Sequence, residues 1–336
     1  MIDTCNMWLP SAEITGAVGR SLARTLYRFP VTVLLAGDVG AGKTTFLQGF
    51  AQGLHIGEPV VSPTFALEQR YVIGAGPAAG RELLHLDLYR LRTDQAAELV
   101  GASDDQTGIR CIEWAPRLSH PPAGSTIAIS LRDERAGRRL TAVFDDIPLP
   151  ARKTMDEWRE EVMLPVHVRR HCDVVAALAA TLAERLLQHG VLVRPHALAR
   201  AAEVHDLFRF LDFRPGAEPN GYVDGEQQKE TWARWRERYP GLKHEPACAA
   251  FLRDRGYPEL GRIVEVHGLA LPSPERQTVE QRLLFYADKR VIIDRIVTLD
   301  ERFADFRARY GNSKTASLHD AWFAEAQAVE RELFGA

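Results

Sequence analysis

The stretch of this sequence that most restricts its fold is residues 37–44, Gly-Asp-Val-Gly-Ala-Gly-Lys-Thr. It satisfies the pattern GxxxxGK followed by Ser or Thr. In this pattern glycines let backbone N–H groups face a phosphate, and the following helix N-terminus adds positive potential. Val31 to Ala36 has the apolar composition of a buried strand, and Thr44 to Gly53 has the spacing of a helix. The order strand, loop, helix predicts a site for the phosphates of ATP or GTP and for Mg²⁺.

The rest of the first half alternates between helical and strand patterns. Ser11 to Leu26 has apolar and small residues at helical spacing. Strand patterns occur at residues 66–73, 83–88, 109–114, 126–131 and 140–144. Prolines interrupt the regular patterns around residues 145–153, so we place a domain boundary near residue 150. We expect residues 1–150 to form an α/β P-loop NTPase domain.

Beyond this boundary almost every segment favours a helix. The predicted helices cover residues 166–189, 195–210, 245–255, 258–267, 278–305 and 317–334. Residues 212–242 carry several prolines and glycines, which predicts an irregular insertion with one short helix around residues 232–239. Because 336 residues exceed one typical domain, we expect residues 151–336 to form a second, all-α domain with its own core.

Composition narrows the classes of function. The net charge of −3 gives no general positive field that would attract nucleic acid. The four cysteines form no CxxC pair, which argues against a disulfide framework or a zinc knuckle. No stretch reaches the roughly 18 apolar residues of a membrane span, and the N-terminus lacks the pattern of a signal peptide. We therefore expect a cytoplasmic protein that does not bind membranes.

The phosphate loop assigns roles to individual residues. Lys43 is expected to reach the β and γ phosphates, and Thr44 to offer its hydroxyl to Mg²⁺, which prefers oxygen ligands. Phosphoryl transfer also needs an acid near the metal, and Asp87 and Glu113 each follow a buried strand. Lys43, Asp87 and Glu113 are thus the predicted catalytic residues. The other predicted nucleotide-binding residues of the loop and the first helical turn are Gly37, Asp38, Gly40, Ala41, Gly42 and Thr45.

Four pieces in a fixed order extend this motif: GDVGAGKTTFLQGFAQGL, VSPTF, HLDLYRL and EW. Together they resemble TsaE, the ATPase component of bacterial tRNA threonylcarbamoyladenosine (t6A) synthesis, over residues from about 10 to 148. The resemblance implies that Thr64 lies near the γ phosphate in a switch segment, that Glu113 joins Thr44 around Mg²⁺ and that Asp87 takes the Walker B position. It also implies that Trp114 packs beside the nucleotide.

The same resemblance implies a cellular role. TsaE proteins hydrolyse ATP while docked on the TsaB and TsaD proteins, so tRNA would be an indirect partner. The sequence has no NKxD tetrapeptide of the kind that reads guanine, which favours ATP over GTP. A general P-loop kinase is the competing interpretation, but no arginine-rich lid segment is evident.

The second half carries a set of imidazoles and carboxylates on a background of other polar residues. The set consists of His171, the adjacent pair His205 and Asp206, His244, His267 and Asp288. Such ligands suit divalent Fe, Mn, Zn, Ni or Co, and six of them are enough for two ions that share one carboxylate. Asp206 is the expected bridging ligand and the predicted catalytic residue. The helical spacing of Val174, Val175 and Leu178 predicts that His171 points inward.

The set occurs as HCDVV, VHD, KHEPA, EVHG and YADKR, and it resembles the HD-domain metal-dependent phosphohydrolases. The resemblance implies an HD-like helical fold with one or two transition-metal ions and a small phosphorylated substrate, either a nucleotide or another phosphate ester. Arg209 stands in HDLFR where the family usually has Lys, and it can hold phosphate bidentately. Arg209 and Lys289 are the predicted phosphate-binding residues.

Two functions remain open for the second half. In one, the chain is a fusion of an ATPase and a metal-dependent phosphohydrolase. In the other, only the P-loop half is catalytic, and the helical half is a sensor or docking module with a structural or degraded metal site. The seven other histidines are expected in surface or packing roles, with His167 the strongest exception because it lies one turn before His171.

Overall fold

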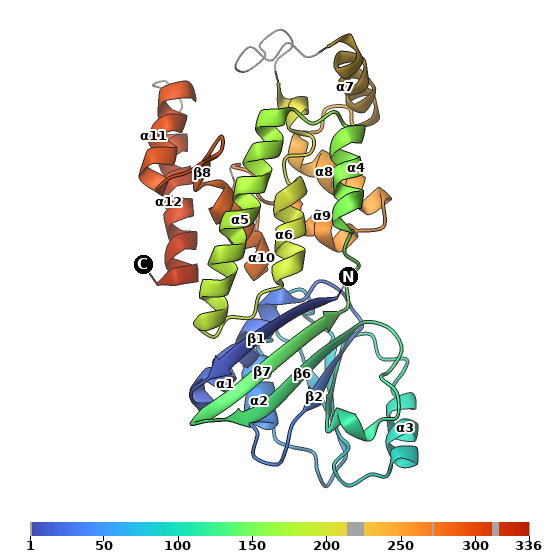
Figure 1. Ribbon diagram of the computed structural model, residues 1–336. Coiled ribbons are helices and arrows are strands. Elements are labelled where there is room, and N and C mark those ends of the chain that lie inside the picture. Colours follow the sequence, from blue (N-terminus) through green and yellow to red (C-terminus); the bar gives the residue numbers. More distant parts are fainter. Residues whose placement is uncertain (1, 214–224, 271, 311–315, 336) are drawn as a thin grey trace. The chain divides into compact units, whose positions relative to one another are not determined.

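The computed structural model describes residues 2–213, 225–270, 272–310 and 316–335. These residues form two compact units (Figure 1). One contains residues 2–147 together with residues 184–195, and the other contains residues 148–183 together with the chain from residue 196 onward. The expected insertion at residues 212–242 lies partly outside the described residues, which resume at Gly225.

The first unit is built on a seven-stranded mixed sheet with the order β1-β7-β6-β2-β5-β4-β3. The strands are β1 (Asp3–Leu9), β2 (Val31–Ala36), β3 (Glu68–Val72), β4 (Glu82–Asp87), β5 (Ile109–Glu113), β6 (Thr126–Glu134) and β7 (Gly137–Asp145). The strands β6, β2, β5 and β4 run parallel, and β1, β7 and β3 pair antiparallel to their neighbours. The carboxyl ends of β2, β5 and β4 therefore meet at one edge of the sheet, where ligands of such folds usually bind.

Helices cover both faces of this sheet. The helices α1 (Ala12–Leu22) and α2 (Lys43–Gly53) pack on one face, over a core that includes Val33, Leu35 and Phe46. The helix α3 (Thr93–Gly101) packs on the other face, against Leu86 and neighbouring apolar residues. Two 3₁₀ turns, Ala23–Thr25 and Ala115–Arg117, complete the unit. Figure 1 shows α1 and α2 side by side behind the sheet.

Glycines set the close approach of α1 and α2. A Cβ on Gly19 would lie 2.0 Å from the Phe46 carbonyl oxygen, and one on Gly49 would lie 2.0 Å from the Gly16 carbonyl oxygen. No side chain fits at these distances, so only glycine allows the two backbones to touch. This packing holds α2, which begins at Lys43, firmly against the sheet.

The structure confirms the strand, loop and helix predicted around residues 31–53, and the five later strands of the first half. It adds β1 and α3, which the sequence patterns did not reveal to us. The strand β1 alternates buried and exposed residues, with Cys5, Met7 and Leu9 facing the core. That alternation was the available signal.

The described part of the second unit is helical apart from a short hairpin. Its helices are α4 (Arg152–Glu161), α5 (Val166–Gln188), α6 (Pro195–Val204), α7 (Glu226–Arg238), α8 (His244–Asp254), α9 (Pro258–Glu265), α10 (Val279–Asp288), α11 (Leu299–Tyr310) and α12 (Ala316–Phe334). A 3₁₀ turn spans Arg209–Asp212, and the hairpin pairs β8 (Val291–Ile292) with β9 (Arg295–Ile296). The last residues of α5 and the first of α6 belong to the other unit.

The prediction of one helix over residues 278–305 is wrong. The helix α10 ends at Asp288, and the β-branched run from Val291 enters the hairpin, with Ile293 in the left-handed region at a φ of 59°. A new helix then starts after Thr298. The side chain of Thr298 accepts a hydrogen bond from the Glu301 backbone N–H, and the Glu301 carboxylate accepts one from the Thr298 N–H. This capping box favours a helix start inside the predicted helix.

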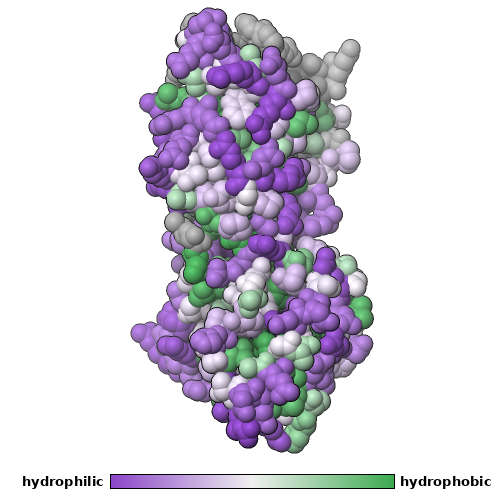
Figure 2. Space-filling view, turned by 90° about the vertical axis from the view of Figure 1, so that its right-hand side faces the viewer, coloured by the Kyte–Doolittle hydropathy of each residue, from purple (hydrophilic) through white to green (hydrophobic). Residues whose placement is uncertain are grey.

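No helix in the described part of the chain is long and apolar enough to cross a membrane. The face drawn in Figure 2 is mostly hydrophilic, and its hydrophobic side chains gather only in small separate groups.

Candidate functional site

The phosphate loop lies between β2 and α2, as predicted. Gly37, Gly40 and Gly42 have φ angles of 147°, 82° and 101°, a region that side chains disfavour. A Cβ on Gly37 would also lie 2.5 Å from the Leu131 carbonyl oxygen, so this position requires glycine. Loops with such φ angles can turn backbone N–H groups toward a phosphate. Thr45 lies in the first turn of α2.

Lys43 is buried at the start of α2. Its ammonium donates hydrogen bonds to the Gly37 carbonyl at 2.7 Å and to the Asp38 carbonyl at 2.9 Å. The same Nζ lies 4.1 Å from the ring centroid of Trp114. Burial lowers the pKa of Lys43, and the charges of Glu113, Asp87 and Asp38 oppose that shift. The ammonium is thus held inside the loop, where a phosphate oxygen can replace the carbonyls.

The two predicted acids lie at adjacent strand ends, because Asp87 and Glu113 are direct partners in the register of β4 and β5. Thr44 Oγ1 lies 3.3 Å from Glu113 Oε1, so one hydroxyl and one carboxylate face each other as they would around a magnesium ion. Asp87 accepts hydrogen bonds from Ser62 Oγ at 3.0 Å and from Thr64 Oγ1 at 2.6 Å. The segment at Ser62 to Thr64 is therefore tied directly to the second acid.

Most of the residues assigned from the sequence line one cavity: Gly40, Lys43, Thr44, Thr64, Asp87, Glu113 and Trp114. Ala41 is buried beneath the loop, and its N–H donates to the Asp38 carbonyl. Trp114 holds a φ of 61°, and its ring contacts that of Tyr89 at 4.8 Å between centroids. The two rings form an aromatic wall beside the loop.

His85 belongs to this site although the sequence pattern left it among the packing residues. Its Nε2 lies 3.1 Å from Glu113 Oε1, and its side chain is fully buried. It precedes Asp87 by two residues on β4, so both side chains lie on the same face of the strand. That spacing, combined with the acid at position 87, was the signal that could have identified it.

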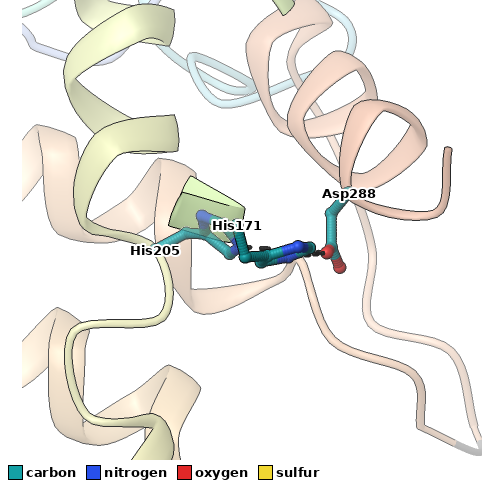
Figure 3. A group of neighbouring side chains, drawn as sticks. All are labelled: His171, His205 and Asp288. Atoms are coloured by element: carbon teal, nitrogen blue, oxygen red, sulfur yellow. Dashed lines mark hydrogen bonds and ion pairs between the residues drawn. The ribbon is translucent and has the colours of Figure 1, made fainter. Parts of the chain in front are cut away.

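In the helical unit the six predicted ligands converge on one place. They come from α5 (His171), from the turn after α6 (His205 and Asp206), from the first residue of α8 (His244), from the turn after α9 (His267) and from the end of α10 (Asp288). Figure 3 shows His171, His205 and Asp288 directed toward one another.

Asp288 and Asp206 are the two carboxylates of this cluster. His171 Nε2 lies 2.9 Å from Asp288 Oδ1. On the other side, Asp206 Oδ1 lies 3.1 Å from His244 Nε2 and 3.6 Å from His267 Nε2. Asp206 Oδ2 faces His205 Nε2 at 3.9 Å, so this carboxylate touches both parts of the cluster.

The backbone orients three of the imidazoles. The Nδ1 atoms of His171, His205 and His267 donate to the carbonyl oxygens of Ile293 at 3.0 Å, Ala202 at 2.8 Å and Val264 at 2.6 Å. Each ring therefore turns its Nε2 atom inward. Metal-binding histidines are held in this way, because the bond at one nitrogen fixes the tautomer and the direction of the other.

A carboxylate orients the fourth imidazole. His244 Nδ1 lies 2.5 Å from Asp212 Oδ2. Burial opposes protonation of His244, but the carboxylates of Asp206 and Asp212 outweigh it and raise its pKa. Burial, reinforced by the charges of His205 and His244 and opposed by the hydrogen bond to Asp206, lowers the pKa of His267 to about 4. Neutral His267 is thus ready to bind a metal ion, whereas His244 would release a proton first.

The donors of the cluster fit divalent metal ions. The Nε2 atom of His205 is buried and has no hydrogen-bond partner among the described residues. It faces Asp288 Oδ1 at 3.8 Å and Asp206 Oδ2 at 3.9 Å. The ligand atoms of His171, His205 and Asp288 lie within 4.8 Å of one another, and so do those of His205, Asp206 and His267. A buried imidazole nitrogen that faces two carboxylates without a bond is satisfied when a cation lies between them.

The two predicted phosphate-binding cations lie at the edge of the cluster. Arg209 Nη1 lies 3.2 Å from both ring nitrogens of His244, and the side chain lines the cavities on either side of Asp206. Lys289 is buried, and its ammonium contacts the Asp288 carboxylate and the His267 carbonyl. A phosphate-binding role for each stays a prediction.

Comparison with known proteins identifies the first unit. The family model described as "Threonylcarbamoyl adenosine biosynthesis protein TsaE" matches residues 9–140. A protein of Nostoc sp. named tRNA threonylcarbamoyladenosine biosynthesis protein TsaE is 41% identical over 122 residues, which are 35% of this chain and 72% of that protein. Proteins with the same name are 37% identical in Synechocystis sp., over 36% and 76% of the two chains, and 38% identical in Treponema pallidum, over 40% and 95%.

A solved structure, that of the Bacillus subtilis protein YdiB, is 25% identical, with a TM-score of 0.35, over 43% of this chain and 88% of that one. The Nostoc and Synechocystis relatives are matched over most of their own length. The chain therefore belongs, through its first unit, to the TsaE family.

Proposed function

We propose that this chain joins two hydrolases: an ATPase that serves t6A modification of tRNA, and a metal-dependent phosphohydrolase of the HD type. Membership of the TsaE family supports the first part, since the relatives are named for tRNA threonylcarbamoyladenosine biosynthesis. The convergence of four imidazole Nε2 atoms on Asp206 and Asp288 supports the second.

In the first unit the loop and Lys43 hold the phosphates of ATP, and Thr44 and Glu113 hold Mg²⁺. The bound ion would neutralise charge on the β and γ phosphates. Thr64 exchanges its bond to Asp87 for contact with the γ phosphate, which couples the switch segment to the state of the nucleotide. The TsaB and TsaD proteins are the proposed partners, and tRNA is met only through them.

The test of the first activity is phosphate release from ATP by the full chain, alone and with the TsaB and TsaD proteins. We expect slow turnover that rises when the partners are added. Lys43→Ala, Thr44→Ala and Glu113→Ala should each abolish it. Lys153→Ala, a substitution of an exposed side chain on α4, serves as the control. Unchanged turnover in Lys43→Ala contradicts the proposal.

In the second unit the proposed reaction is hydrolysis of a nucleotide or another phosphate ester. The water oxygen bonds to phosphorus, the bond from phosphorus to the ester oxygen breaks, and a proton from water passes to the leaving alcohol. Divalent ions such as Fe, Mn, Zn, Ni or Co, when bound, lower the pKa of water toward neutrality. Asp206 serves both halves of the ligand set, Arg209 neutralises phosphate, and Lys289 lies against Asp288 and adds positive charge.

The test is a metal analysis of the full chain combined with hydrolysis of a panel of phosphate esters. We expect bound transition metal and activity in the wild type, and loss of both in His205→Ala and Asp206→Ala. His189→Ala is a matched control, because this histidine is exposed and its Nδ1 donates to the Arg185 carbonyl within its own turn. A wild type that is both metal-free and inactive contradicts the proposal. Bound metal without hydrolysis favours the alternative, a sensor or docking module.

A further inference from the structure

Arg302 of α11 is a buried cation beside the metal-ligand cluster, and neither sequence motif accounts for it. Its side chain is 14% exposed, and it lines both cavities that flank His171 and Asp206. Among the described residues its Nε has no hydrogen-bond partner. Its guanidinium forms a loose ion pair with Asp305, whose Oδ2 lies 3.7 Å from Arg302 Nη1. A guanidinium held this way keeps donors available for a ligand.

The surroundings of Arg302 favour an anion. Arg209 and Arg309 line the same cavity, so three guanidinium groups share it. Asp305 is already bonded to Arg309 Nε at 2.8 Å, and Asp212 lies 3.5 Å from Arg209 Nη1. The remaining acid of the wall, Asp206, faces the imidazoles. The side chains of Arg209 and Arg309 are partly exposed, whereas that of Arg302 is largely buried. A buried charge is costly unless it is well paired, so the loosely paired guanidinium of Arg302 fits a phosphate that enters the cavity.

Aromatic rings line the same cavity as these arginines. The guanidinium of Arg302 lies 4.1 Å from the ring centroid of Phe306, and Phe213 and His167 stack nearly parallel at 6.4 Å between centroids. All three rings line the cavity. Flat aromatic surfaces beside cationic groups bind planar aromatic ligands that carry a phosphate.

We propose that Arg302 is a second phosphate-binding residue beside Arg209, and that the substrate is a phosphomonoester with an aromatic ring, of which nucleoside 5′-monophosphates are the cellular class. The ring rests against Phe306, and Arg302 holds the phosphate that reacts at the ligand cluster. This inference rests on the proposed phosphohydrolase function and names its substrate.

The test compares AMP with ribose 5-phosphate, which lacks the base. Every protein carries Lys43→Ala, so that the phosphate loop of the other unit does not bind the ligand. Arg302→Ala should raise KM for both substrates about tenfold or more, with a smaller effect on kcat, because a charge-assisted bond in both ground and transition state is lost. Arg302→Lys should restore part of the loss. Phe306→Leu should raise KM for AMP and leave that for ribose 5-phosphate unchanged.

Two further measurements separate binding from structure. Arg307→Ala, which removes an exposed guanidinium of the same helix that pairs with Asp320, should match the parent in KM. Arg302→Ala should keep the bound metal and the Tm of the parent, since it removes a poorly paired buried charge. Loss of metal, or a marked drop in Tm, would make Arg302 a structural residue and overturn the inference.

Calorimetric titration with the 5′-phosphonate analogue of AMP distinguishes failure of the inference from failure of the proposed function. Hydrolysis of AMP with KM indifferent to Arg302 overturns the inference and leaves the phosphohydrolase intact. If the protein binds the analogue in a way that requires Arg302 but does not hydrolyse AMP, the result supports the binding site and contradicts the proposed phosphohydrolase activity. If the protein neither hydrolyses AMP nor binds the analogue, both the inference and the proposed function are overturned.

Discussion

Replacement of His85 provides a sharp test of how the first unit holds magnesium. The His85 side chain is fully buried, and its Nε2 bonds to Glu113 at 3.1 Å. A hydrogen bond to a charged group contributes about 1.5–3 kcal/mol, which corresponds to roughly 10- to 100-fold in an equilibrium constant. Glu113 keeps its contact with Thr44 at 3.3 Å, so we expect the lower part of this range. His85→Leu should therefore weaken magnesium binding about tenfold, since the carboxylate loses its orientation.

The assay is ATP hydrolysis by the full chain as a function of magnesium concentration. His85→Leu should shift half-saturation to higher magnesium, whereas His85→Gln, which keeps a donor, should shift it less. Binding of ATP without magnesium should be the same in all three proteins, and thermal unfolding checks that each variant folds. A magnesium dependence of His85→Leu equal to that of the wild type would refute the positioning role.

Three other predictions follow from buried contacts. Asp146→Ala should lower the free energy of unfolding by about 3–5 kcal/mol, because the Arg194 guanidinium, which is fully buried and bonded to Asp146 at 2.8 Å, loses its carboxylate partner. Denaturant titration measures this change, and a decrease below about 1 kcal/mol contradicts the prediction. Elemental analysis should find that Asp206→Ala loses all bound metal while His171→Ala keeps about one of two ions, and equal losses would disprove a shared carboxylate. Asp212→Asn should weaken metal binding about 10- to 100-fold through His244, as competition with a chelator would show, and unaltered affinity rules this out.

Local pattern was enough to predict the phosphate loop and its strand and helix, because each requirement lies within residues 31–53. The two acids of this site could also be predicted, because Asp87 and Glu113 each end an apolar run and parallel strands bring such ends together. The six ligands of the helical unit were also predicted from residue type, and they lie together in the structure, His244 through its contact with Asp206.

The sequence did not reveal features that depend on contacts between distant segments. The break between α10 and α11 was missed because the β-branched run from Val291 lowers helix propensity only slightly, and tertiary contacts decide the outcome. This break is functionally relevant, since the carbonyl of Ile293 in the hairpin orients His171. Asp212 and Arg302 reach the cluster from a 3₁₀ turn and from α11, and no spacing rule connects them with the ligands.

We propose that one chain has two separate activities that release phosphate. The most direct measurement is phosphate release from ATP and from AMP by the full chain and two single variants. We predict that Lys43→Ala loses ATP hydrolysis and keeps metal-dependent hydrolysis of the monoester. We predict the converse for Asp206→Ala. Loss of both activities in Lys43→Ala, or a wild type that never hydrolyses a phosphomonoester when supplied with divalent metal, would contradict the account.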